Sequence, residues 1–247
     1  MQRTASILVR LGRFALLALA GEVLYTTLRD LPQLEGIDAS GTLGDPDAPP
    51  LRIAVLGDSS CTGPGLDDPD EIWIRRIARN LADRYYVTVD SMAIGGSRAH
   101  DVLRDQVPAI LPTRPDLALV SVGSNDMLYG VPVRVFERNL ERIVTELLSS
   151  AAVVIVSGVG DLGTIPRLPF ALTRLMRFRA ARADRVHTRI ASGNPRVFKV
   201  PIREQTADAF RDPRVFSHDL LHANGRGHRL WAEAAQPTVE EALALYR

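Results

Sequence analysis

The stretch LRIAVLGDSS, residues 51–60, places an apolar run directly before a glycine and three small polar residues. A short apolar run bounded by turn residues is typical of a strand buried on both faces, and the polar residues mark its exit into a loop. With Leu51–Leu56 as the first, five strands are predicted. The other four are Tyr86–Asp90, Leu117–Val122, Val153–Val156 and Val197–Val200.

Longer amphipathic segments separate these runs, with apolar residues three or four positions apart, as on one face of a helix. They are Ile72–Arg84, Val133–Leu148, about 171–191 and Gly225–Tyr246. We expect the last to break before Pro237, because proline disrupts a helix interior. Alternating strands and helices with continuous apolar strands predict an α/β protein whose parallel sheet has helices on both faces.

The composition excludes several classes of protein. The chain has 247 residues, is 46% hydrophobic and carries a formal net charge of +1, which argues against disorder and against binding to nucleic acid. Cys61 is the single cysteine, so an internal disulfide framework and a cysteine-rich metal site are excluded. Lys199 is the single lysine, which argues against Schiff-base chemistry as the function.

Residues 1–50 differ from the rest, and we divide the chain into an N-terminal apolar segment with a linker (1–50) and a domain (51–247). Arginines precede a short apolar run at Phe14–Gly21, which is far below the ~20 residues of a spanning helix. Two interpretations stay open: a signal-like segment that is exported or anchored, or a surface helix in peripheral contact with the domain or a membrane. A cytoplasmic or membrane-associated location is favoured. Residues 36–50 are expected to form the linker.

Small polar turns follow the first three predicted strands, at Gly57–Ser60, Gly95–Ser97 and Gly123–Asp126. In open parallel sheets, ligands bind beyond the carboxyl ends of the strands. These turns therefore predict a site at one rim of the sheet.

The rim and the C-terminal region contain the groups that acyl transfer needs. A serine nucleophile requires a base, an acid that orients the base, and donors for the oxyanion. Ser59 is the candidate nucleophile, and the D-x-x-H pair Asp219 and His222 supplies the orienting acid and the base. The oxyanion donors expected are the N–H groups of Ser59 and Gly96 and the side-chain amide of Asn125.

Four short blocks follow one another along the chain: Gly57–Ser59, a glycine after the second predicted strand, Gly123–Asp126 and Asp219–His222. In this order they resemble the SGNH hydrolases, also called GDSL esterases/lipases, over roughly residues 51–235. The resemblance implies a flavodoxin-like three-layer α/β/α sandwich around a five-stranded parallel sheet. It also implies a serine esterase that acts without a cofactor on a small-molecule ester, of a lipid or an acylated carbohydrate. The second block departs from the family pattern, with Ser91 and Ala93 at its start, so Gly95 stays an alternative to Gly96.

Three further functions remain open. The first is a zinc peptidase, because His218, His222 and His228, with Asp219 as general base, match the pattern of such enzymes except that Asp replaces Glu. That site would need a helix carrying His218 and His222 on one face. The second is a non-catalytic binding module of the same fold, and the third is an acyltransferase that uses the same triad.

The remaining polar and apolar features have structural explanations. Asp58 and Asp126 are expected to form backbone hydrogen bonds around the site, Cys61 to pack, and His100 and His187 to be solvated. The loop Leu162–Phe170 is either the wall for an acyl chain or a rigid surface loop. The arginines of the 171–191 helix form either a solvated face or a contact surface for anionic lipid.

Overall fold

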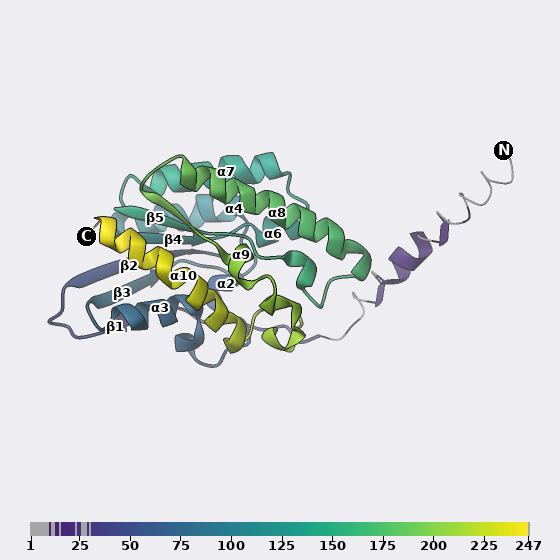
Figure 1. The fold of residues 1–247 in the computed structure, drawn as a ribbon, viewed down its shortest axis with the longest axis horizontal. Helices are drawn as coiled ribbons and strands as arrows, with labels where there is room; N and C mark the ends of the chain where they lie inside the picture. Colours follow the sequence, from purple (N-terminus) through teal and green to yellow (C-terminus); the bar gives the residue numbers. More distant parts are fainter. Residues whose placement is uncertain are drawn as a thin grey trace.

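One mixed sheet forms the centre of the molecule, with its strands in the order β1-β3-β2-β4-β5-β6 (Figure 1). It is seen in a computed structural model that describes residues 10, 13–14, 16–22, 24–25, 29 and 31–246. The strands of this described part are β1 (Gly41–Leu43), β2 (Pro50–Gly57), β3 (Tyr86–Ser91), β4 (Leu117–Ser121), β5 (Val153–Ser157) and β6 (Val197–Val200). β2 to β6 pair in parallel, as continuous apolar strands favour.

The parallel strands follow the flavodoxin-like order. Numbered among themselves along the chain, β2 to β6 lie in the order 2-1-3-4-5, and the order reverses between β2 and β4. Gly57 at the end of β2 is paired with Ser121 at the end of β4. The ligand-binding crevice expected for this topology therefore opens beside Gly57.

The predicted count of five strands is wrong by one, because residues in the predicted linker add β1. This strand pairs antiparallel with β3, and Gly41 lies opposite Val89. Three residues, GTL, are too few to show a strand pattern in the sequence. β1 covers the edge of β3, which would otherwise present unpaired backbone groups. The division of the chain at Leu51 stays a prediction.

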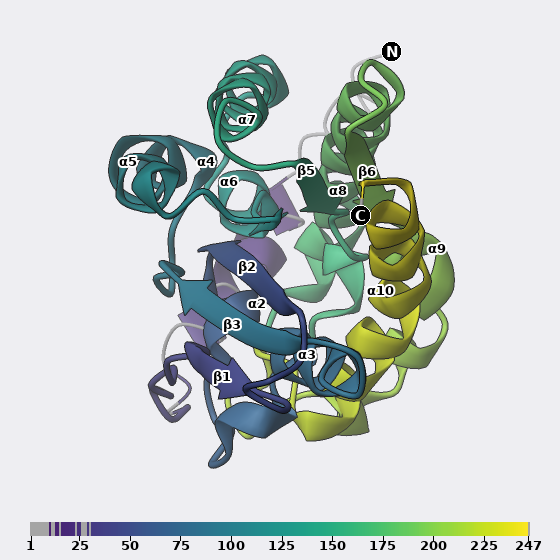
Figure 2. The ribbon, with the colours of Figure 1, turned by 90° about the vertical axis from the view of Figure 1, so that its left-hand side faces the viewer.

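Helices cover both faces of the sheet, as Figure 2 shows for α4–α7 on one side and α3, α9 and α10 on the other. The first layer contains α4 (Ala99–Asp101), α5 (Val107–Ile110), α6 (Ser124–Leu128), α7 (Val133–Leu147) and α8 (Phe170–Ser192), with a π-helical turn, η2 (Val102–Gln106), between α4 and α5. The other elements are α2 (Ser59–Thr62), α3 (Trp73–Leu81), α9 (Ile202–Thr206), α10 (Gly225–Tyr246) and the 3-10 turns η1 (Pro69–Glu71), η3 (Leu111–Thr113), η4 (Leu162–Thr164), η5 (Ala209–Arg211) and η6 (Pro213–Val215).

Two hydrophobic cores, one on each face, hold the three layers together. Alternate residues of a strand point to opposite faces, so Leu56 and Val120 pack under α7 and α8, whereas Val55 and Leu119 pack under α3 and α10. Trp73 and Phe136 are the largest fully buried side chains, one in each core. This three-layer sandwich is the predicted fold.

The break expected before Pro237 does not occur, because α10 continues from Gly225 to Tyr246 with Pro237 inside it. Proline removes one helical N–H donor. Pro237 lies on the exposed side of α10, where water can bond the carbonyl that loses its partner. Among the helices of the described residues, none combines the length and apolarity needed to cross a bilayer.

Candidate active site

The three polar turns meet at the carboxyl edge of the sheet and are joined by side-chain hydrogen bonds. The Asn125 amide, Nδ2, donates to the Ser97 carbonyl at 3.1 Å and lies 3.4 Å from Asp58 Oδ2. The Asp126 carboxylate accepts the Ala99 N–H at 3.0 Å. The turn after β4 therefore holds the turns after β3 and β2 in place.

Ser59 is the first residue of α2, directly after β2. Asp58 caps this short helix by accepting the Ser60 N–H at 2.9 Å, so its backbone role is confirmed. Burial raises the pKa of the Asp58 carboxyl to about 6, because a buried carboxylate loses its hydration. Gly57 is required before this turn, since a Cβ there would lie 2.2 Å from the Ser121 carbonyl oxygen.

The turn after β3 contains both candidate glycines. The Ser97 N–H bonds the Ile94 carbonyl at 3.2 Å, and Gly96, the third residue of this turn, has φ +82°, which favours glycine. A Cβ at Gly95 would lie 3.9 Å from the Ser59 Cβ, whereas a Cβ at Gly96 would meet no atom within 4 Å. Gly95 is thus the closer to Ser59, and Gly96 leaves open space.

Gln106, which the sequence patterns did not single out, connects the end of β2 to the turn after β3. Its side-chain oxygen accepts the Gly57 N–H at 2.8 Å, and its amide donates to the Gly57 carbonyl at 2.9 Å and to the Ser97 hydroxyl at 3.1 Å. Gln106 is buried in η2. A signal was present, because Val102, Gln106 and Ile110 share one helical face and Gln106 is the polar residue among them.

His222 is oriented by Asp219 in a tight turn. The Asp219 Oδ2 lies 2.6 Å from His222 Nδ1, and its Oδ1 accepts the N–H groups of Leu221 at 3.0 Å and His222 at 3.1 Å. Burial raises the pKa of Asp219, but these hydrogen bonds outweigh it and hold the pKa below its ordinary value. Leu220 adopts φ +59° to close the turn.

Ser59, Asn125 and His222 line one cavity, although they are far apart in the sequence. Within the described residues, no hydrogen bond joins the Ser59 hydroxyl to His222. Asp219 is buried and reaches the cavity through His222. The structure therefore gathers Ser59, Asn125 and His222 around one space, with Asp219 behind His222, whereas Gly96 is not among the described residues that line it.

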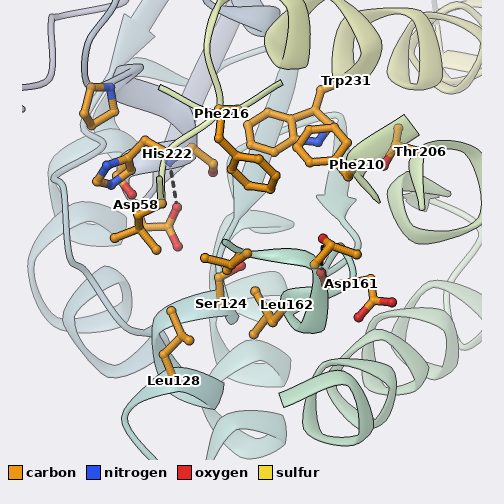
Figure 3. A pocket seen from close by; sticks show the side chains of 18 of the residues that line it. Asp58, Ser124, Leu128, Asp161, Leu162, Thr206, Phe210, Phe216, His222 and Trp231 are labelled. Atoms are coloured by element: carbon orange, nitrogen blue, oxygen red, sulfur yellow. Dashed lines mark hydrogen bonds between the residues drawn. The ribbon is translucent and has the colours of Figure 1, made fainter. Parts of the chain in front are cut away.

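Apolar side chains form most of the remaining wall of this cavity. Figure 3 shows the rings of Phe210, Phe216 and Trp231 on one side and Leu128 and Leu162 on the other. The Phe210 and Trp231 rings stack with their centroids 5.4 Å apart, and Phe216 meets Phe210 edge-on. Leu162, Thr164 and Ile165 of the loop 162–170 contribute to the lining. The cavity can accommodate an apolar group beside a polar rim.

The zinc-site hypothesis lacks its structural basis. Residues 217–223 form turns rather than the helix that such a site needs, and the Ser217 N–H bonds the His222 carbonyl at 2.7 Å. His228 accepts the Trp73 N–H at Nδ1 within the core. Among the residues that the structure describes, no three His, Cys, Asp or Glu side chains are grouped to hold a metal.

The prediction that His187 is solvated is wrong, because its ring is fully buried against Phe136 and bonds the Ala183 carbonyl at 2.9 Å. Burial lowers the pKa of His187 to about 4 and that of His228 to about 3. His100 is exposed and Cys61 is buried, as expected. Burial raises the pKa of the Cys61 thiol, which opposes any nucleophilic role.

Comparison with known proteins identifies similar chains. Residues 55–230 match the model of the GDSL-like lipase/acylhydrolase family. The chain is 29% identical over 202 residues to the GDSL-like esterase Rv1075c of Mycobacterium tuberculosis, covering 78% of this chain and 63% of that protein. It is 28% identical over 110 residues to esterase TesA of Pseudomonas aeruginosa, covering 43% of this chain and 53% of that one. The matches thus span less than two thirds of either curated relative.

A solved structure has the same fold. The crystal structure of TesA superimposes with a TM-score of 0.65 at 22% identity, covering 77% of this chain and 99% of that one. The sandwich described above is therefore shared with the solved structure of TesA.

Proposed function

The chain belongs to the GDSL-like lipase/acylhydrolase family, and on that premise we propose that it hydrolyses carboxylic esters through an acyl-enzyme formed on Ser59. The observation that carries this proposal is the 2.6 Å contact between Asp219 Oδ2 and His222 Nδ1, with His222 and Ser59 in one cavity lining. Because Nδ1 is engaged by the carboxylate, Nε2 is the nitrogen free to act as a base.

In the first step, the Ser59 oxygen attacks the ester carbonyl while His222 Nε2 accepts the hydroxyl proton. Asp219 keeps the imidazole oriented and stabilises its cation. His222 then returns the proton to the leaving alcohol, and the acyl group stays on Ser59. Water, activated by the same imidazole, releases the acid in the second step.

The oxyanion formed in both steps needs converging donors. The Ser59 N–H belongs to the first residue of α2 and has no helical acceptor. We assign the other two donors to the Asn125 amide and the Gly96 N–H, with the Gly95 N–H as the alternative because Gly95 lies closer to Ser59. Asn125 is supported in this role by its position in the cavity lining and by the anchoring bond to Ser97. Its longer 3.4 Å contact with Asp58 is the one that an oxyanion would replace.

The apolar wall supports a substrate with an acyl chain. Leu162 and Ile165 lie in the same lining as Ser59, which favours the acyl-wall role of the 162–170 loop over that of a simple surface loop. Burial of each methylene against such a wall contributes ~0.8 kcal/mol. The substrate class we propose is therefore an acyl ester, of a lipid or of an acylated small molecule or carbohydrate.

The test compares two serines of the same cavity. A fluorophosphonate probe should label the wild type and Ser124→Ala, and should not label Ser59→Ala. Hydrolysis of a short p-nitrophenyl ester should be lost in Ser59→Ala alone. Labelling and turnover that persist in Ser59→Ala would refute the assignment. An absence of labelling in the wild type would favour the non-catalytic binding module.

Product analysis with an alcohol acceptor separates hydrolysis from acyl transfer. Free acid as the product, even with excess alcohol, supports the esterase. A new ester as the main product would instead indicate an acyltransferase that uses the same triad.

A further inference from the structure

The helix α8 carries an excess of positive charge on its outer side. Its sequence, Phe170–Ser192, contains six arginines and one acidic residue, Asp184. Asp184 is buried and pairs with Lys199 at 2.9 Å. The charge that α8 presents to its surroundings is therefore entirely positive.

Large apolar side chains stand among these arginines. Phe170 is 83% exposed, Leu175 48% and Phe178 56%. The guanidinium of Arg182 lies 5.8 Å from the centre of the Phe178 ring. Exposed aromatic and aliphatic residues mixed with arginines are typical of helices that lie at a membrane surface. We call Phe170, Arg174, Leu175, Phe178, Arg182 and Arg185 the α8 face.

A groove between α7 and α8 extends the positive surface. Arg134 from α7 and Arg182 and Arg185 from α8 line it, with no acidic partner among the described residues. Glu137, which also lines the groove, pairs with Arg189. The groove can therefore accept an anionic headgroup at three unneutralised guanidiniums.

The N-terminal segment joins the molecule at the same place. The Glu22 carboxylate accepts the N–H groups of Phe170 and Ala171, the first two residues of α8. Phe14, Leu16 and Leu17 of that segment are highly exposed. Figure 1 shows the described parts of the segment leaving the domain beside the N-terminal end of α8. Apolar side chains of both elements are thus available at one end of the molecule.

This end adjoins the cavity of the candidate active site. The loop that lines the cavity with Leu162 and Ile165 runs directly into Phe170. Asp161, another lining residue, forms an ion pair with Arg177 of α8 at 2.9 Å. A surface bound to α8 would therefore lie next to the loop that lines this cavity.

We propose that the α8 face and the N-terminal segment bind the surface of a bilayer that contains anionic phospholipid. The arginines attract the headgroups, and the exposed phenylalanines and leucines enter the boundary with the acyl chains. Nucleic acid is the less fitting anion, because the net charge of the chain is only +1 and the arginines alternate with apolar side chains. That the bilayer also delivers an ester substrate rests on the proposed function.

Sedimentation with vesicles tests the binding without requiring catalysis. The full chain is mixed with phosphatidylcholine vesicles with or without phosphatidylglycerol. The charge variant is Arg174→Gln/Arg182→Gln/Arg185→Gln, and its control, Arg79→Gln/Arg84→Gln/Arg229→Gln, removes equal charge from α3, α10 and the turn after α3. The apolar variant is Leu175→Ser/Phe178→Ser, with Leu245→Ser as control because Leu245 is 65% exposed at the far end of α10.

We expect binding that depends on phosphatidylglycerol and is weakened roughly 100-fold in the charge variant, since each basic residue near an anionic membrane contributes ~1 kcal/mol. The apolar variant should bind at least tenfold more weakly, and both controls should bind like the wild type. An equal loss of vesicle binding in the charge variant and its control would overturn the proposal. Wild-type binding that does not depend on phosphatidylglycerol would overturn it too. Hydrolysis of a soluble p-nitrophenyl ester by all variants reports separately on folding and on the proposed function.

Discussion

The side-chain amide of Gln106 forms two hydrogen bonds with Gly57, accepting its N–H at 2.8 Å and donating to its carbonyl at 2.9 Å. It thereby acts as a strand neighbour for the last residue of β2, two positions before Ser59. A third bond, to the Ser97 hydroxyl at 3.1 Å, connects Gln106 to the turn after β3. The position of the candidate nucleophile therefore depends on a side chain from the helical layer.

Replacing Gln106 with leucine leaves the buried Gly57 N–H without its hydrogen-bond acceptor, whereas the Gly57 carbonyl keeps the Ile94 N–H as a donor. An unpaired buried donor costs about 1–3 kcal/mol, so the free energy of unfolding should fall by about that amount in urea denaturation. The kcat of ester hydrolysis should fall more than KM changes, because Ser59 is displaced. Gln205→Leu, at an exposed position of α9, is the control. Unchanged stability of Gln106→Leu would contradict this account of the turn.

Asp219→Asn tests the orienting role of the carboxylate. An asparagine can still accept the backbone N–H groups of the turn through its oxygen, but it no longer stabilises the His222 cation. We expect kcat/KM on a short ester to fall ~10³–10⁴-fold, with an unchanged far-UV circular dichroism spectrum. Asp208→Asn, at an exposed carboxylate, should retain full activity. Near-normal turnover by Asp219→Asn would exclude the triad.

Asp58 should make stability depend on pH in the direction opposite to most carboxylates. Its pKa is raised from 3.8 to about 6 by burial, so between these values the folded chain holds a proton that the unfolded chain releases. This contribution to stability is present below pH 4 and is lost as the pH rises to 6, by about 3 kcal/mol. Urea titrations of Asp58→Asn against the wild type across this range measure it. A constant difference between the two proteins would show that Asp58 does not titrate there.

His187 should contribute to acid destabilisation. Its pKa is lowered from 6.5 to about 4 by burial, so below pH 6.5 the unfolded chain binds a proton that the folded chain rejects. Stability is therefore lost as the pH falls from 6.5 to 4, by up to about 3 kcal/mol. In His187→Leu, the free energy of unfolding should fall less steeply over this range. An NMR titration in which the wild-type His187 ring protonates near pH 6.5 would contradict the prediction.

The strands and the rim could be predicted because their signals are local. Each of the five parallel strands is a short segment rich in apolar, aromatic or β-branched residues and bounded by turn residues, and the topology then places Gly57, Gly96 and Gly123 at one edge. β1 escaped prediction because an antiparallel edge strand of three residues depends on its partner and not on its own pattern. The break expected at Pro237 was wrong because the exposure that makes this proline tolerable is a property of the packed molecule.

Burial and contacts between distant parts of the same chain explain the other predictions that were wrong or missing. His187 has the sequence neighbours of a surface residue, and its fully buried position follows from the way α8 packs against Phe136. His228 similarly belongs to a zinc-like spacing in the sequence but bonds the Trp73 N–H, 155 positions away. The link from Glu22 to the start of α8 joins residues 148 and 149 positions apart, which no local pattern records.

The ion pairs of Lys199 with Asp184 and Glu204, at 2.9 and 2.7 Å, withdraw the sole lysine side chain of the sequence from solvent. Acylating reagents that target lysine, such as succinimidyl dyes and crosslinkers, will consequently react slowly with the native chain at this amine. Their rate of attachment to Lys199 becomes a gauge of how often the β6 edge opens. Coupling to a solid support is better directed elsewhere.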